Sequence, residues 1–181
     1  MKASAILILL ALIFSGSRFA ASAGMSPVVE LPPGVMPLEG RPAPALKLSD
    51  MDDGHFDLAA KRGQWVLVHF WASWCGPCRR EMPTIQGLME QVSDSALEIV
   101  LINTSETDDD VFSFLSIAAP DLDTLMDYDG EVTARWQPRG LPASFIVDPS
   151  GRIQYMALGG RLWDSPEYVE FLLHLVENDK R

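Results

Sequence analysis

The stretch FWASWCGPCRREMP, residues 70–83, contains both cysteines of this 181-residue chain, separated by two residues. It begins at the end of WVLVHFW, residues 65–71, an apolar run typical of a strand that is buried on both faces of a sheet. After Gly76, apolar residues recur with a helical period at Met82, Ile85, Leu88, Met89 and Val92. The sequence therefore predicts a buried strand, a short junction that carries the cysteines, and a helix.

The position of the two cysteines at this junction favours redox chemistry. Unpaired backbone N–H groups and the positive end of the helix dipole stabilise a thiolate at the helix start, so Cys75 is the candidate nucleophile. Cys78 lies one turn further along, where it can attack a mixed disulfide on Cys75 and release the partner. Pro77 suits the first helical turn, because its missing N–H would have no partner there.

A structural crosslink and a metal site are the other uses of such a pair. Closing so short a loop restrains the unfolded chain far less than the roughly 3 kcal/mol expected for a loop of about 15 residues. Zinc needs two ligands besides two thiolates, and His55, His69 and His174 are not paired at ligand spacing. We therefore expect a redox-active Cys75–Cys78 disulfide, no metal and no other cofactor.

The rest of the chain predicts one α/β domain without internal repeats. Apolar runs, turn signals and capping residues indicate the following elements: a hairpin or strand pair within residues 45–64, a buried strand at 97–103, a helix at 108–118, an antiparallel hairpin around the turn at 148–151, and a final helix that opens with Ser165 as its cap and Pro166 at its first position.

The amino terminus resembles an export signal. Lys2 precedes a largely apolar stretch, residues 3–14, and Ala21-Ser22-Ala23 has the small-x-small pattern of a cleavage site. The apolar stretch is shorter than the roughly 20 residues that span a membrane, although an uncleaved anchor remains the alternative. We expect a signal peptide at residues 1–23 and a location in an oxidising, periplasm-like compartment.

Residues 24–44 carry six prolines between Pro27 and Pro44 and little periodicity. We expect an extended, partly mobile leader there with no core to bury, followed by the folded domain at residues 45–181. Cleavage after residue 23 leaves 12 basic residues against 25 acidic ones, a net charge of 12 − 25 = −13. Such a charge disfavours nucleic acid and anionic lipid surfaces as partners.

The motif WASWCGPCRREMP resembles the active site of the thioredoxin superfamily, and residues 40–178 resemble its TlpA/ResA-like branch of exported thiol:disulfide reductases. The other marks of the resemblance are GRPAPALKLSDMDDGHFDL (40–58), DYDGEVTARWQPRGLPASFIVDPSGRI (127–153) and GGRLWDSP (159–166). The resemblance implies a thioredoxin-like α/β fold: a central mixed sheet of four or five strands, helices on both faces and an amino-terminal β-hairpin extension.

The resemblance also assigns residues around the cysteines. Pro83 matches the helix-kinking proline of the branch, and Pro142, after Leu141, matches a cis-proline opposite the cysteines whose neighbouring backbone pairs with an incoming chain. Gly76 and Pro77 match the reducing members. We accordingly place the substrate-binding surface at Trp74, Gly76, Pro77, Leu141 and Pro142.

Two residues are candidate proton acceptors for Cys78, which we expect to be more buried than Cys75. Glu81 matches an acidic residue that reductases of this branch use near the dithiol, although a solvated carboxylate offsetting the neighbouring arginines is the alternative. His69 departs from the pattern, since thioredoxin has Asp there and the branch often has Asn. It either inherits the proton-accepting work or is a hydrogen-bonded core histidine.

The resemblance implies an enzyme that reduces disulfides in client proteins, with apocytochrome c or copper-delivery proteins as candidate clients. Its reductant would be a membrane thiol transporter, and we expect a monomer. A disulfide oxidant and a non-catalytic copper or haem chaperone are the alternatives. A peroxidase is disfavoured, because the pattern P-x-x-x-T-x-x-C is absent. Asp127 to Glu131 resembles the start of a calcium loop but lacks its later ligands, so we interpret it as a turn.

Overall fold

The computed structural model describes residues 30–178. The expected signal peptide and cleavage site lie outside the described residues. The elements are β1 (Val35–Pro42), β2 (Lys47–Ser49), β3 (His55–Asp57), η1 (Leu58–Lys61), β4 (Trp65–Trp71), α1 (Gly76–Gln91), β5 (Leu97–Thr104), α2 (Asp108–Ala118), β6 (Leu125–Asp127), α3 (Glu131–Trp136), β7 (Ala143–Val147), β8 (Arg152–Leu158) and α4 (Pro166–Asn178). Among these residues, no helix is both long and apolar enough to cross a bilayer.

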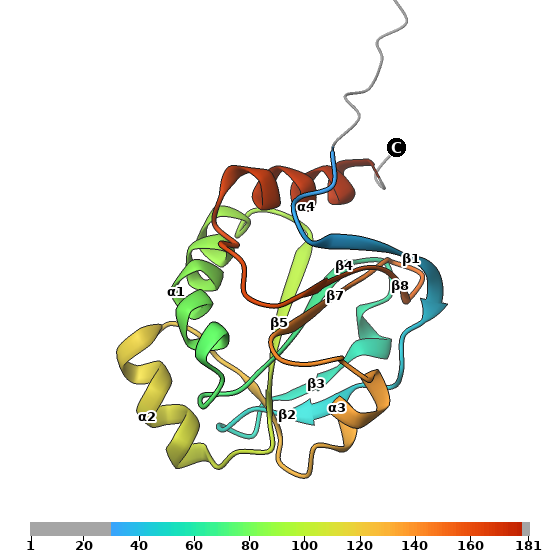
Figure 1. The fold of residues 1–181 in the computed structure, drawn as a ribbon. Coiled ribbons are helices and arrows are strands. Elements are labelled where there is room, and N and C mark those ends of the chain that lie inside the picture. The colour runs from blue at the N-terminus through green and yellow to red at the C-terminus, as the bar shows by residue number, and fades with distance from the viewer. Residues whose placement is uncertain (1–29, 179–181) are drawn as a thin grey trace, which may run out of the picture.

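A mixed six-stranded sheet forms the centre of the molecule, in the order β1-β8-β7-β4-β5-β6 (Figure 1). Strand β4 pairs in parallel with β5 and antiparallel with β7, so it is central as well as buried. This confirms the mixed sheet, with six strands instead of the four or five that the resemblance implied. Strands β2 and β3 pair separately, as the expected amino-terminal hairpin.

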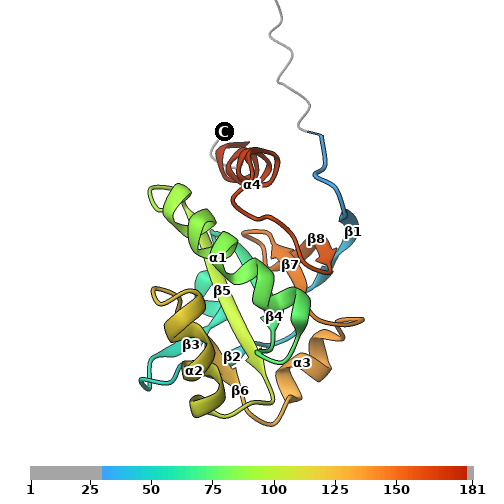
Figure 2. The same ribbon diagram turned by 60° about the vertical axis from the view of Figure 1, so that its left-hand side comes forward.

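Both faces of the sheet are covered, and each has its own apolar core. One core joins β4 and β5 to α1, α2 and α4 through residues such as Leu67, Trp71 and Leu172. The other joins the opposite face of the sheet to α3 and the β2–β3 hairpin, with Trp136 and Phe145 near its centre. Figure 2 shows α1, α2 and α4 on one side of the sheet and α3 on the other.

Order begins earlier than the sequence indicated. The leader was expected to have no core to bury up to residue 44, but β1 pairs with β8 and the Val35 side chain is buried. Strand β1 is at the edge of the sheet, and its pairing shifts register between Pro37 and Arg41. Edge strands tolerate proline because only one side of the strand has to form ladder hydrogen bonds.

The start of the final helix also differs from the cap that the sequence predicted. Helix α4 begins at Pro166, as expected, and the Ser165 carbonyl accepts hydrogen bonds from the N–H groups of Tyr168 and Val169. The Ser165 hydroxyl itself has no hydrogen-bond partner among the described residues, so the expected side-chain cap is wrong. Burial of Tyr168 and Leu172 against the core holds the helix instead.

Candidate functional site

The two cysteines lie at the end of β4 and the start of α1, as the sequence predicted. They form a disulfide with an S–S distance of 2.09 Å. Cys75 is the N-cap of α1, and its sulfur accepts a hydrogen bond from the Cys78 N–H at 3.3 Å. Cys75 is 5% exposed and Cys78 is fully buried, which confirms the expected difference in burial. Of the two cysteines, only Cys75 therefore retains any exposed surface.

A buried histidine and glutamate face each other beneath α1. The Nε2 atom of His69 lies 3.1 Å from Oε1 of Glu81, and the two side chains are 1% and 2% exposed. These two atoms are in close contact, but their alignment does not meet the geometry of a hydrogen bond. On the other side of the ring, Nδ1 of His69 lies 2.8 Å from the Ser144 hydroxyl, on the neighbouring strand β7.

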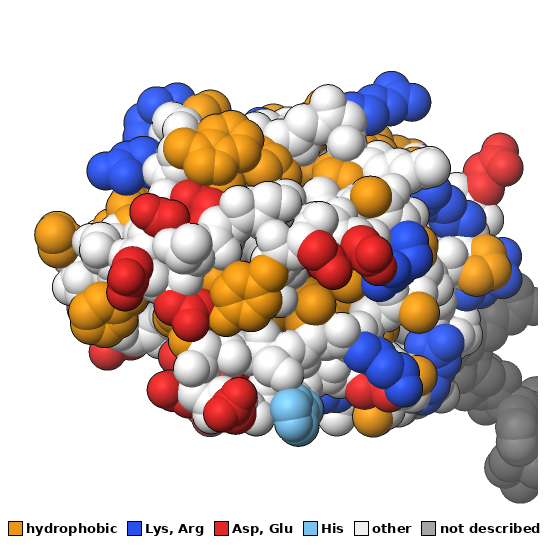
Figure 3. Space-filling view, turned by 90° about the horizontal axis from the view of Figure 1, so that it is seen from below, with side chains coloured by type: hydrophobic (Ala, Val, Ile, Leu, Met, Phe, Trp, Pro, Cys, Tyr) orange, Lys and Arg blue, Asp and Glu red, His pale blue; other side chains and the backbone are white. Residues whose placement is uncertain are grey.

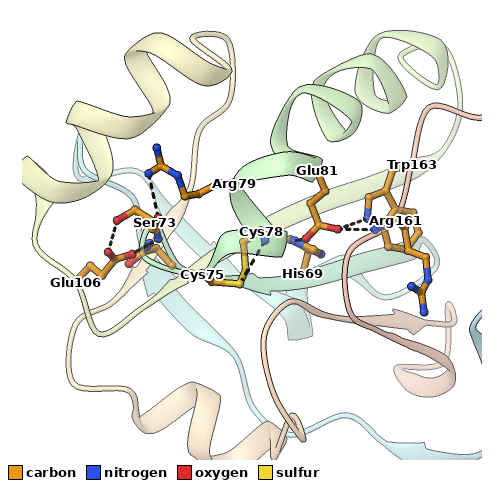
Figure 4. Close-up of a disulfide and its surroundings, with 10 residues drawn as sticks. His69, Ser73, Cys75, Cys78, Arg79, Glu81, Glu106, Arg161 and Trp163 are labelled. Carbon is orange, nitrogen blue, oxygen red and sulfur yellow. Dashed lines mark hydrogen bonds and ion pairs between the residues drawn. A yellow bond between two sulfur atoms is a disulfide. The ribbon is translucent and has the colours of Figure 1, made fainter.

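The second carboxylate oxygen of Glu81 anchors the loop that follows β8. It accepts hydrogen bonds from the Arg161 N–H at 3.0 Å and from the Trp163 indole N–H at 3.3 Å. Glu81 is therefore not the solvated surface carboxylate that the sequence left open. His69 and Glu81, which the sequence offered as alternatives, are brought together on the face of α1 that also carries Cys78 (Figure 4).

A groove adjoins the disulfide on the same side of the molecule. It has a volume of about 400 Å³, and Glu81 forms part of its wall. The other lining residues are Pro77, Arg80, Gly160, Arg161 and Leu162. Of the buried pair, Glu81 is the member that lines this groove.

The expected substrate-binding residues surround the cysteines. The peptide bond between Leu141 and Pro142 is cis, as the resemblance implied. Pro142 precedes Ala143, which pairs with Phe70 near the end of β4, so the proline lies at the same end of the sheet as the disulfide. Trp74 is 69% exposed. Seen from below, hydrophobic and acidic side chains are interspersed on the surface, and lysine and arginine lie mainly toward its edges (Figure 3).

The sequence did not predict a hydrogen-bonded network that lies on the other side of the disulfide. Glu106, between β5 and α2, accepts hydrogen bonds from the N–H and hydroxyl of Ser73 and from the side chain of Asn103. Arg79 donates to the Ser73 carbonyl at 3.1 Å. The signal in the sequence was the polar run Asn103 to Glu106 at the carboxyl end of a predicted strand, because the carboxyl ends of adjacent parallel strands meet at one edge of the sheet.

Two further features near the site are structural. Trp71 is a packing residue: it is fully buried and its indole N–H donates to Thr124. The segment Asp127 to Glu131 is a turn, as expected, and the Asp127 carboxylate accepts hydrogen bonds from the Val132 and Thr133 N–H groups at the start of α3. No cluster of three or more potential metal ligands occurs among residues 30–178.

Comparison with known proteins agrees with this geometry. Residues 40–156 match the AhpC/TSA family. The thiol-disulfide oxidoreductase ResA of Bacillus subtilis is 27% identical over 67% of this chain and 68% of its own length. The thiol:disulfide interchange protein HelX of Rhodobacter capsulatus is 35% identical over 67% of this chain and 69% of its own length. The chain thus spans about two thirds of the curated relatives it matches.

Solved structures extend the similarity to the whole fold. A thiol:disulfide interchange protein DsbE from Chlorobium tepidum superposes with a TM-score of 0.66, at 26% identity, over 80% of this chain and 99% of its own. StoA from Bacillus subtilis superposes with a TM-score of 0.61 at 20% identity, which shows the fold alone. The cysteine pair at a strand-to-helix junction, the thioredoxin-like fold and the matched residues together show that this chain belongs to the AhpC/TSA family, among its thioredoxin-like thiol:disulfide oxidoreductases.

Proposed function

We propose that this chain is an exported enzyme that reduces disulfides in client proteins. The observation that carries the proposal is the difference between the two cysteines: Cys75 caps the start of α1 and keeps 5% of its surface exposed, whereas Cys78, three residues further along, is fully buried. Resolution needs such a pair, in which one sulfur meets the client and the other is shielded from it.

The reaction proceeds in two balanced steps from the reduced dithiol. The Cys75 thiolate attacks one sulfur of the client disulfide, forms a mixed disulfide and releases the other client sulfur as a thiolate that takes up a proton. Cys78 then loses its proton and attacks the Cys75 sulfur, which releases the second client thiol. Two electrons pass to the client, and the enzyme is left with the Cys75–Cys78 disulfide.

The buried pair supplies a route for the Cys78 proton in the second step. Cys78 is fully buried, so it needs a nearby acceptor to become a thiolate. Glu81 lies one helical turn further along α1, contacts His69, and forms part of the groove wall that leads to solvent. We assign Glu81 as the proton acceptor and His69 as its partner, held in orientation by Ser144.

Turnover requires an external reductant, because an oxidising compartment does not return the disulfide to the dithiol. By resemblance the donor is a membrane thiol transporter, and apocytochrome c or copper-delivery proteins are the candidate clients. The relatives support the chemistry through their names, thiol-disulfide oxidoreductase and thiol:disulfide interchange protein. A peroxidase is disfavoured, since Val68 and Ala72 replace the proline and threonine of the peroxidase pattern.

Reduction of insulin disulfides by the mature protein, with dithiothreitol as the electron source, tests the proposal. We expect turnover in the unmodified protein and none above background in Cys75→Ser. An oxidant would instead introduce disulfides into a reduced, unfolded protein faster than it reduces insulin. A chaperone would retain copper or haem stoichiometrically on the reduced thiols without reducing insulin.

A further inference from the structure

The loop between β4 and α1 presents an exposed aromatic side chain directly before the nucleophilic cysteine. Trp74 is 69% exposed, whereas its neighbour Cys75 is 5% exposed and the preceding residues Trp71 and Ala72 are fully buried. Tryptophan is enriched among the residues that dominate binding energy at protein interfaces. An indole left in solvent beside a reactive disulfide is thus placed to contact a client polypeptide.

Ser73, which precedes this tryptophan, is bonded through all of its polar atoms. Its N–H donates to Oε2 of Glu106 at 2.6 Å, and its hydroxyl donates to Oε1 of the same carboxylate. Its carbonyl accepts a hydrogen bond from Nη1 of Arg79 at 3.1 Å. The Arg79 guanidinium in turn lies over the Phe114 ring, 4.5 Å from its centroid. The backbone next to Trp74 is therefore fixed from two directions.

Glu106 is itself held in place from its own side. Asn103, which is fully buried, donates from Nδ2 to Oε2 of Glu106 at 2.6 Å. Ser105 has a left-handed backbone conformation, with φ of 59°, and its N–H donates to the Asp127 carbonyl. Because this conformation is unfavourable for serine, the surrounding contacts impose it and direct the next residue, Glu106, toward the β4–α1 loop.

From this arrangement we infer that Glu106 is a positioning residue, which acts through Ser73 to hold Trp74 as a rigid contact for the client polypeptide. The inference rests on the proposed function. Hydrogen bonds to a carboxylate are stronger than neutral ones, so the two from Ser73 restrain the loop well, and the third, from Asn103, holds the carboxylate itself. A contact residue that is already ordered loses less conformational entropy when a partner binds, and affinity rises accordingly. Figure 4 shows the Glu106–Ser73–Arg79 network on one side of the disulfide and the His69–Glu81 pair on the other.

A double-mutant cycle on insulin reduction tests whether Glu106 acts through Trp74. We expect Trp74→Ala to lower kcat/KM about tenfold, as for a dominant contact residue. Glu106→Gln should lower it about fivefold in the unmodified protein and less than about twofold in the Trp74→Ala background, since coupled residues are not additive. Equal losses in both backgrounds, or no loss in either, would overturn the inference.

Two further variants keep the test decisive. Glu98→Gln removes a carboxylate from the opposite end of β5 and is the matched control, with kcat/KM expected within about twofold of the unmodified protein. Ser73→Ala removes one donor and leaves the backbone intact, so it replaces Glu106→Gln in the cycle if circular dichroism shows the latter to be unfolded. Its loss should likewise disappear when Trp74 is alanine.

Amide hydrogen exchange gives a readout independent of the client. The Ser73 amide should be protected in the unmodified protein and should exchange about tenfold faster or more in Glu106→Gln, while the amides of the central β4 strand keep their protection. An unchanged exchange rate of the Ser73 amide in Glu106→Gln would contradict the role of Glu106 in holding the loop. Failure of the proposed function would be recognised separately, because the unmodified protein would then not reduce insulin at all.

Discussion

His69 and Glu81 lie 12 positions apart in the sequence, yet Nε2 of the histidine and Oε1 of the glutamate are 3.1 Å apart in a region that solvent hardly reaches. Removing two ionisable groups from water is costly, and such pairs are often no more stable than well-packed apolar residues. Stability alone therefore gives little reason to place the pair under the redox-active helix. Its position on the side of α1 that carries Cys78 is what a proton acceptor requires.

Replacement of the two residues separates their roles. Glu81→Gln should slow release of the mixed disulfide about 10²-fold, the usual contribution of a general base, and His69→Asn should slow it less. Attack by Cys75 should change little in either variant and is the internal control. The defect should shrink as pH rises, since Cys78 then ionises unaided. Stopped-flow kinetics across pH measure both steps; resolution within about threefold of wild type in both variants would leave both residues structural.

The cysteine roles predict opposite behaviour of two serine variants. Cys78→Ser should accumulate mixed disulfides with clients, because the attacking sulfur of Cys75 remains and nothing resolves the intermediate. Cys75→Ser should trap no client, since the remaining sulfur is fully buried. Non-reducing gels and intact mass spectrometry detect the adducts. Equal trapping by the two variants would contradict the assignment of Cys75 as the nucleophile and Cys78 as the resolving cysteine.

Asp148 predicts how stability depends on acidity. Burial acts to raise the pKa of its carboxyl, but hydrogen bonds from the Arg152 N–H and from the side chains of Ser150 and Gln154 outweigh burial and lower the pKa. A group whose pKa is lower in the folded state stabilises the protein above its unfolded pKa, about 3.9 for aspartate, and this contribution is lost as pH falls through the folded value.

The variant Asp148→Asn should therefore lower the free energy of unfolding by about 1–2 kcal/mol at pH 7, the scale of hydrogen bonds to a charged group. The difference from wild type should narrow as the pH falls below about 4. Urea unfolding at several pH values measures this difference in the free energy of unfolding. Glu131→Gln, which removes an exposed ion pair with Arg135, is the control and should cost less than about 0.5 kcal/mol. A difference that stays constant with pH would contradict the account of Asp148.

The sequence predicted the buried and locally capped elements well. Strand β4 begins and ends as the apolar run of residues 65–71 does, because each of its residues has to suit a buried environment. Helix α2 spans Asp108–Ala118, as expected, and Thr107 and Asp110 form a capping box at its start. These signals are local, so they can be read along the chain.

Elements that depend on tertiary contacts were not predicted. Strand β6 has three residues, and α3 has six and is capped by the Asp127 carboxylate, so neither is long enough to show a period. Contacts within the candidate site also depend on tertiary packing. The sequence identified His69 and Glu81 singly, but their contact depends on how α1 packs on β4, and the Ser73–Glu106 contact depends on the pairing of β4 with β5.

Export predicts the chemical identity of the amino terminus. If Ala21-Ser22-Ala23 is a cleavage site, protein recovered from the exporting host should begin at Gly24. Intact mass and amino-terminal sequencing measure this directly, and expression of residues 24–181 without the signal is the control for mass. A recovered chain that keeps Lys2 would show an uncleaved amino terminus and favour the anchor alternative.

The central claim is that the Cys75–Cys78 pair donates electrons to clients, and its reduction potential tests that claim most directly. Equilibration of the mature protein with glutathione or dithiothreitol buffers, followed by thiol alkylation and mass spectrometry, gives the potential. We predict a value closer to about −270 mV, that of thioredoxin, than to about −120 mV, that of DsbA. A potential more oxidising than about −180 mV, that of protein disulfide isomerase, would contradict the claim and make the protein a disulfide oxidant.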